Sequence, residues 1–214
     1  MSTPGGSGLW AWLLLPERSR WRDQWRAGVA VVATTLLLTV DAYHTLFGDE
    51  RLTQVILYLA VPLLLILLLF RESPARYGFC LGDWRAGLVL TGVGWAVAAA
   101  VAATAGRTPA FRAFYSRPGP SSLLWLSDGI ELVGWEFFFR GFLLFALYRA
   151  CGPLALLLQA VPFALAHIGK PELEALSCIF GGTAFGYVAW RTRSALYPFL
   201  IHWFLVVAVT AVAG

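Results

Sequence analysis

Long runs of apolar residues alternate with short polar stretches along most of the chain. Runs of roughly 17 to 25 residues have the length that an α-helix needs to cross the hydrocarbon core of a bilayer. Glycine, proline and acidic residues near positions 48, 119 and 152 separate the runs, because they stop or start helices through their backbone restrictions. The pattern predicts about seven transmembrane helices, near residues 27–46, 53–70, 86–105, 122–148, 153–168, 173–190 and 195–213.

The composition supports an all-α, polytopic membrane helix bundle. Hydrophobic residues make up 59% of the chain and charged residues only 13%, whereas a soluble domain carries about a quarter charged residues. The expected organisation is a single transmembrane domain over 27–214 after an N-terminal cytoplasmic or interfacial segment, 1–26. Membrane lipids are therefore the expected surroundings. The net charge of +4 is spread between the apolar runs, which argues against a nucleic-acid-binding patch.

Basic residues are distributed unevenly between the two predicted sides of the membrane. With a cytoplasmic N-terminus, ten lie on its side: Arg18, Arg20, Arg22, Arg26, Arg71, Arg76, Arg85, Arg149, Arg191 and Arg193. The other side holds five: Arg51, Arg107, Arg112, Arg117 and Lys170. Because positive residues favour the cytoplasmic side, we predict a multi-pass protein of the bacterial plasma membrane whose N-terminus is cytoplasmic.

A charged pair lies inside the fourth predicted helix. Glu136 and Arg140 are four residues apart, so they share one helix face and can neutralise each other in lipid. An ionisable residue within a membrane span is by default a candidate for function. The alternative interpretation is that the pair only ties helices together.

Two histidines accompany this pair in other predicted helices. His167 ends the fifth and His202 lies in the seventh, and a rise of about 1.5 Å per residue puts both at depths that overlap that of Glu136. A carboxylate and an imidazole can activate water, while a second imidazole can donate to an oxyanion. The same three groups could instead bind a divalent metal such as zinc, although no H-E-x-x-H arrangement is present.

The order Glu136-x-x-x-Arg140, Phe163-x-x-x-His167 and then His202 resembles the CPBP family, the CAAX proteases and bacteriocin-processing membrane proteins. The similarity covers roughly residues 120–205. The resemblance implies an intramembrane endopeptidase, of glutamic or metallo type, that hydrolyses a membrane-associated peptide or protein. Carried over by motif, Glu136 and Arg140 match the family's second glutamate and its arginine. His167 matches the histidine that activates water, and His202 matches the oxyanion histidine.

Two positions depart from the family pattern. The first glutamate of the family's E-E-x-x-x-R motif is Trp135 here, and the polar residue expected four positions after His202 is Val206. Tryptophan cannot activate water and valine cannot donate a hydrogen bond. Glu131, one helical turn before Trp135, is a conceivable substitute, and Asp128 is a weaker one. Glu136 itself is the third candidate for the base.

Three classes of function are compatible with these features. The first is the endopeptidase, whose substrate is left open between prenylated CAAX-type proteins, leader peptides and other membrane peptides. The second is a catalytically impaired family member that acts as a membrane binding or scaffold protein, as Trp135 and Val206 suggest. The third, a transporter with a Glu/His proton relay, is disfavoured because the sequence shows no internal repeat and no paired broken helices.

Overall fold

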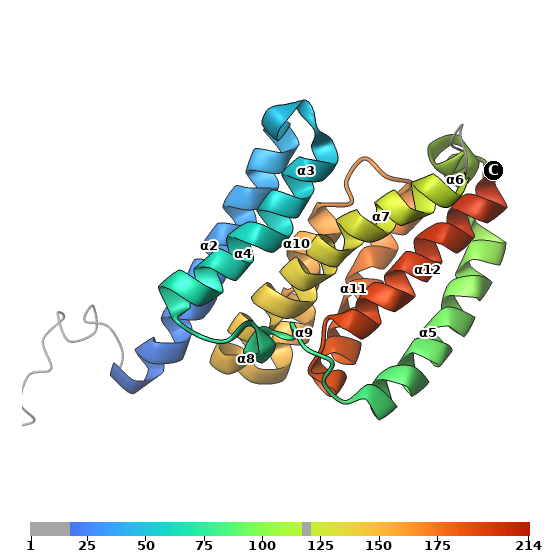
Figure 1. Ribbon diagram of the computed structural model, residues 1–214. Helices are drawn as coiled ribbons and strands as arrows, with labels where there is room; N and C mark the ends of the chain where they lie inside the picture. Colours follow the sequence, from blue (N-terminus) through green and yellow to red (C-terminus); the bar gives the residue numbers. More distant parts are fainter. Residues whose placement is uncertain (1–17, 117–120) are drawn as a thin grey trace, which may run out of the picture.

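The computed structural model describes residues 18–116 and 121–214 and shows a bundle of helices (Figure 1), with no strand in these two ranges. The predicted segment 1–26 therefore lies mostly outside the described residues, and its last part belongs to the first helix. The helices before the middle of the chain are α2 (Arg18–Tyr43), η1 (Leu46–Gly48), α3 (Glu50–Val55), η2 (Ile56–Ala60), α4 (Val61–Leu64), η3 (Leu65–Phe70), η4 (Pro74–Tyr77), α5 (Trp84–Ala105) and α6 (Pro109–Tyr115).

The second half of the chain supplies the centre of the bundle. Its helices are α7 (Ser121–Glu136), η5 (Phe137–Leu143), α8 (Leu144–Cys151), η6 (Gly152–Leu154), α9 (Ala155–Leu158), α10 (Ala160–Leu165), α11 (Glu172–Thr192) and α12 (Leu196–Ala213). In Figure 1, α7 lies between the α3–α4 rod and α12, and its residues contact both. α12 packs along α5 on the outer side, and α10 packs against α11.

Five helical stretches among the described residues are long and apolar enough to cross a membrane. They are Gln24–Tyr43, Glu50–Phe70, Trp84–Ala105, Trp125–Leu165 and Leu196–Ala213. The predicted count of seven is therefore not confirmed. The expected spans at 122–148 and 153–168 fall within one long apolar stretch. The expected span at 173–190 is a helix, α11, but its glycine, serine and threonine residues dilute its mean hydropathy.

The deepest part of the core surrounds the wide, π-helical turn η5. Phe138, Phe139 and Phe142 are fully buried there, and Tyr58 from η2 packs against Phe138 with ring centroids 4.9 Å apart. π-helical turns inside α-helices occur mostly as single insertions and are frequent at functional sites. Here the turn follows Glu136 directly and contains Arg140, so the charged pair sits at the centre of the aromatic core.

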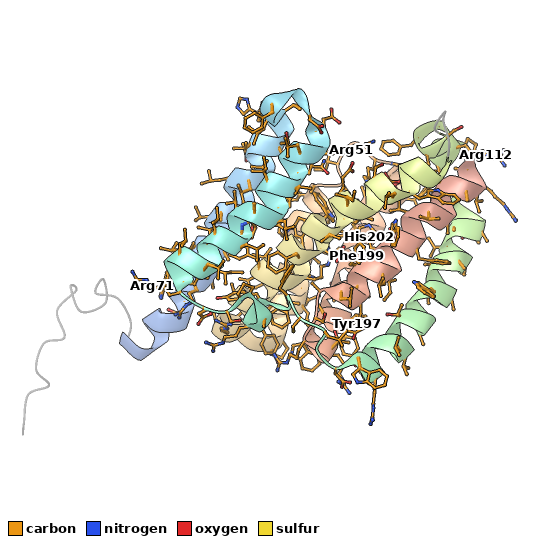
Figure 2. The ribbon with its side chains drawn as sticks, viewed as in Figure 1. Arg51, Arg71, Arg112, Tyr197, Phe199 and His202 are labelled. Atoms are coloured by element: carbon orange, nitrogen blue, oxygen red, sulfur yellow. The ribbon has the colours of Figure 1, made fainter. Side chains whose placement is uncertain are left out.

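The two ends of the bundle carry different residues. Figure 2 shows Arg51 and Arg112 at one end, Arg71 and Tyr197 toward the other, and His202 between them. The end with Arg51 also carries α6 and the last residues of α12 (Figure 1). His202 therefore lies in the interior along the bundle axis, which is where the sequence pattern expects the functional residues.

Candidate active site

Glu136 and Arg140 form the charged pair that the sequence predicts. Arg140 Nη1 lies 3.3 Å from Glu136 Oε1, and both side chains have no exposure. Two charges removed from water are stable only when each is compensated. The pair is thus a fully desolvated ion pair on the central helix.

The guanidinium of Arg140 is compensated by aromatic rings as well as by the carboxylate. It lies 3.8 Å from the centroid of the Phe163 ring and 5.3 Å from that of Phe185. None of its nitrogens makes a hydrogen bond to the described residues. Cation–π attraction is strongest where the cation is desolvated. The two rings and the Glu136 carboxylate therefore offset the cost of burying the Arg140 charge.

His202 reaches the same carboxylate from α12. Its Nδ1 lies 2.6 Å from Glu136 Oε1, and the residue is 7% exposed. An ionised carboxylate can only accept a hydrogen bond, so Nδ1 of His202 carries the proton and donates it. Glu136 therefore bridges Arg140 and His202, and Nε2 is the ring nitrogen of His202 that remains for another partner.

The His167 ring is held by a hydrogen bond to a backbone carbonyl four residues earlier in the chain. It follows the end of α10, and its Nδ1 lies 2.7 Å from the carbonyl oxygen of Phe163. Because a carbonyl only accepts, Nδ1 donates and the neutral ring keeps an unprotonated Nε2. His167 is 3% exposed, so its surroundings hold the ring in place.

Both histidines line one cavity of about 460 Å³. It lies between α7, α12, the turn after α10 and the α2–α3 end of the bundle, and Figure 2 shows His202 in the middle of this region. Four acidic residues line it as well: Asp41, Glu50, Asp128 and Glu131. Glu136 is not among the lining residues and has no exposure. Both histidines thus line the cavity. Glu136 does not line it and contacts His202 from the protein interior.

Trp135 and Val206 line this cavity where the family pattern has polar groups. The Trp135 ring lies edge-on to the His167 ring, with centroids 6.0 Å apart, and edge-on to Tyr58 at 5.1 Å. Where the family pattern has its first glutamate, this chain therefore has the aromatic side chain of Trp135 beside His167.

Glu131 lines the cavity as well and is partly exposed. Its Oε1 is 3.0 Å from Arg51 Nε, and its side chain is 27% exposed. It shares the cavity with His167 and His202, yet Arg51 pairs with it on α3. Asp128, the other candidate, is buried and lines the same cavity.

Asp41 is a polar residue of the site that the sequence interpretation missed. It lies within the apolar stretch Gln24–Tyr43, and the hydroxyl of the buried Tyr58 donates to its Oδ2 at 2.6 Å. Asp41 lines both the histidine cavity and an adjoining apolar groove between α2 and α10. The signal was available, because an aspartate inside a predicted span is a candidate by the same rule that selected Glu136.

The predicted ligand set for zinc does not converge in the described residues. No three His, Cys, Asp or Glu side chains in residues 18–116 and 121–214 are placed to hold one ion. Catalytic zinc sites have three protein ligands, so the side chains of this site do not fit a zinc centre.

Comparison with known proteins points to the same part of the chain. Residues 122–208 match the family model described as type II CAAX prenyl endopeptidase Rce1-like. This segment contains all four candidate residues, Glu136, Arg140, His167 and His202. No curated protein and no solved structure matches the chain. This segment is thus similar to the CPBP/CAAX protease family, whose Rce1-like members are intramembrane proteases.

Proposed function

We propose that the protein is an intramembrane endopeptidase that hydrolyses a membrane-associated peptide by a water activated at His167. The observation that carries this proposal is one cavity lined by two histidines, each with its Nδ1 already engaged. This leaves Nε2 of both rings for chemistry in the cavity.

His167 is the proposed general base. Its tautomer is fixed by the Phe163 carbonyl, which leaves a lone pair on Nε2. An imidazole within reach of a bound water can remove a proton from it near neutral pH. The aromatic wall formed by Trp135 limits the space on one side of the ring.

His202 is the proposed oxyanion donor. Its Nδ1 is hydrogen-bonded to Glu136, which fixes the orientation of the ring, and in this proposal Nε2 also carries a proton and donates it to the oxyanion. Arg140 in turn pairs with Glu136 and holds its carboxylate beside His202. In this proposal Glu136 and Arg140 are positioning residues, because neither lines the cavity.

The reaction balances as a simple hydrolysis. Water gives one proton to Nε2 of His167 as its oxygen bonds to the peptide carbonyl carbon, and the resulting oxyanion accepts a hydrogen bond from His202. When the carbon–nitrogen bond breaks, the proton on His167 passes to the leaving amine. The products are a carboxylic acid and an amine, and no covalent enzyme intermediate forms.

An apolar groove beside the cavity supports a membrane-associated substrate. It holds about 550 Å³ between α2 and α10, and it shares Asp41, Trp135 and Ala166 with the histidine cavity. A hydrophobic segment in the groove would have its backbone next to the two histidines. A prenylated CAAX-type protein or a leader peptide would suit this arrangement, with the N-terminus of the enzyme in the cytoplasm.

A second candidate function is a binding or scaffold protein that has lost catalysis. Trp135 and Val206, which replace two polar residues of the family pattern, both face the cavity and favour it. In that case the cavity would hold a peptide without cleaving it.

Cleavage in water labelled with ¹⁸O separates the two candidates. Purified protein in liposomes is mixed with membrane-anchored peptides, and fragments are identified by mass spectrometry. The proposal expects fragments with ¹⁸O in the new carboxyl group from the wild type and none from the His167→Gln variant. Peptide binding without fragments from the wild type would favour the scaffold. His44→Gln is the matched control, because His44 is exposed at the end of α2.

A further inference from the structure

A second pocket lies toward the end of the bundle that carries Arg71, away from Arg51 and Arg112 (Figure 2). It holds about 330 Å³ and is lined by Ala75, Arg76, Phe145, Tyr148, Arg149 and Arg193. Three arginines from η4, α8 and the end of α11 thus surround one small volume. None of them belongs to the proposed catalytic site.

The only carboxylate paired with these arginines in the described residues, Glu72, is shared. Arg76 Nη1 lies 3.2 Å from Glu72 Oε1, and Arg149 donates to Oε2. The Tyr77 hydroxyl also donates to Oε2, at 2.8 Å. Burial raises the pKa of Glu72, but the hydrogen bonds from Arg149 and Tyr77 and the nearby positive charges outweigh it and leave that pKa below its ordinary value. One negative charge therefore faces three positive ones.

Arg193 adds charge at the rim of the pocket. It ends α11 in the left-handed region, with φ 59°, and is exposed. No ion pair joins its guanidinium to an acidic residue in 18–116 or 121–214. The nearby Asp83 pairs with Arg191 instead, with 2.9 Å between Oδ2 and Nη1. The side chain of Arg76 is also largely exposed, at 62%. The Arg193 guanidinium can therefore turn toward an anion, and the Arg76 guanidinium is bonded to Glu72 through Nη1 alone.

The pocket is at the depth where phospholipid headgroups lie. The apolar stretch Glu50–Phe70 ends just before it along the chain, and the stretch Leu196–Ala213 begins just after it. Figure 2 shows Arg71 and Tyr197 toward this end. Phe145 and Tyr148 of α8 give the pocket an apolar wall beside its arginines. Basic pockets between helices at this level suit anionic lipid headgroups.

We infer that this pocket binds the phosphate group of an anionic membrane phospholipid. Arg76 and Arg193 would clamp the phosphate oxygens, since the guanidinium fork matches phosphate geometry. Arg149, held by Glu72, would supply a fixed positive charge behind them. The glycerol and the first acyl carbons would lie against Phe145 and Tyr148. Free phosphate offers the same charged group without an acyl chain.

Native mass spectrometry of the detergent-purified protein tests this inference without any need for cleavage. We expect dioleoyl-phosphatidylglycerol to bind more tightly than dioleoyl-phosphatidylcholine. Arg76→Gln and Arg193→Gln should each weaken phosphatidylglycerol binding about fivefold, the effect of removing roughly 1 kcal/mol per basic residue. Both residues are exposed, so the variants keep the fold. The matched control is Arg112→Gln, at the opposite end of the bundle (Figure 2).

Three results would overturn the assignment. Equal binding of the two lipids would show that the headgroup charge is not recognised. An equal loss in the Arg112→Gln variant would show a general charge effect rather than a pocket. Displacement of the lipid by an equimolar amount of inorganic phosphate would assign the pocket to the free anion.

Discussion

Removing the charge of Glu136 should destabilise the protein through Arg140. The variant Glu136→Gln keeps the shape of the side chain but leaves the guanidinium without a counterion in a site with no exposure. Breaking a buried ion pair by removing one partner costs about 3–5 kcal/mol. The Phe163 ring, 3.8 Å from the guanidinium, offsets up to roughly 2 kcal/mol. We therefore expect a loss of about 3 kcal/mol in the free energy of unfolding.

The double variant isolates the contribution of the pair. Arg140→Met removes the guanidinium and leaves a flexible apolar side chain among the same rings. Since the buried positive charge is then absent, Glu136→Gln should cost less in this background. We expect the two changes to be non-additive by about 2–3 kcal/mol, at the upper end of the range for residues in contact.

Reversible unfolding in mixed micelles, followed by far-ultraviolet circular dichroism, measures these differences. Glu131→Gln is the control, because its partner Arg51 is exposed and such a pair contributes about 1 kcal/mol or less. The reasoning fails if the two changes at Glu136 and Arg140 add within about 0.5 kcal/mol. It also fails if Glu131→Gln costs as much as Glu136→Gln.

Three further predictions concern other contacts. Tyr58→Phe should cost about 1–3 kcal/mol of unfolding free energy, because it removes the hydroxyl that donates to Asp41; a change below about 0.3 kcal/mol in micelle unfolding would contradict this. The lowered pKa of Glu72 stabilises the fold above the ordinary value of 4.5, and this contribution is lost as the pH falls through the lowered pKa. The unfolding free energy should therefore drop more steeply on acidification in the wild type than in Glu72→Gln, and equal slopes would refute the assignment. Gly87→Ala should lower the thermal midpoint because the new carbon would lie 2.2 Å from a tyrosine ring of α12, whereas Gly92→Ala, with nothing within 4 Å, should not.

The helices were largely predictable because their signal is local. Runs of apolar residues and breaks at glycine and proline placed most expected helices within a few residues of their observed positions, although α2 begins at Arg18, nine residues before the expected start. The number of spans was not predictable in the same way. It depends on whether a helix such as α11 is apolar enough to face lipid, and the length of the helix does not decide that. The π-helical turn η5 was also not predicted, because it forms among closely packed aromatic rings.

The sequence identified most residues of the candidate site, but it did not show which of them contact one another. The spacing of Glu136 and Arg140 is local, so the sequence showed that they share a face. The bond between Glu136 and His202 joins residues 66 positions apart and follows from how α12 packs against α7. Asp41 was missed because it lies near the end of a predicted span, where an acidic residue looks interfacial. Only the packing of Tyr58 shows that it faces the interior.

The catalytic role of His167 is the central claim, and the three histidines of the chain test it in one assay. His44, His167 and His202 are each replaced by glutamine, and kcat/KM for a membrane-anchored peptide is measured for each variant. We expect His44→Gln to match the wild type. His167→Gln should lose at least about a hundredfold, as expected when a general base is removed, and His202→Gln should lose a similar factor through the oxyanion. Cleavage by His167→Gln at the rate of His44→Gln would contradict the account.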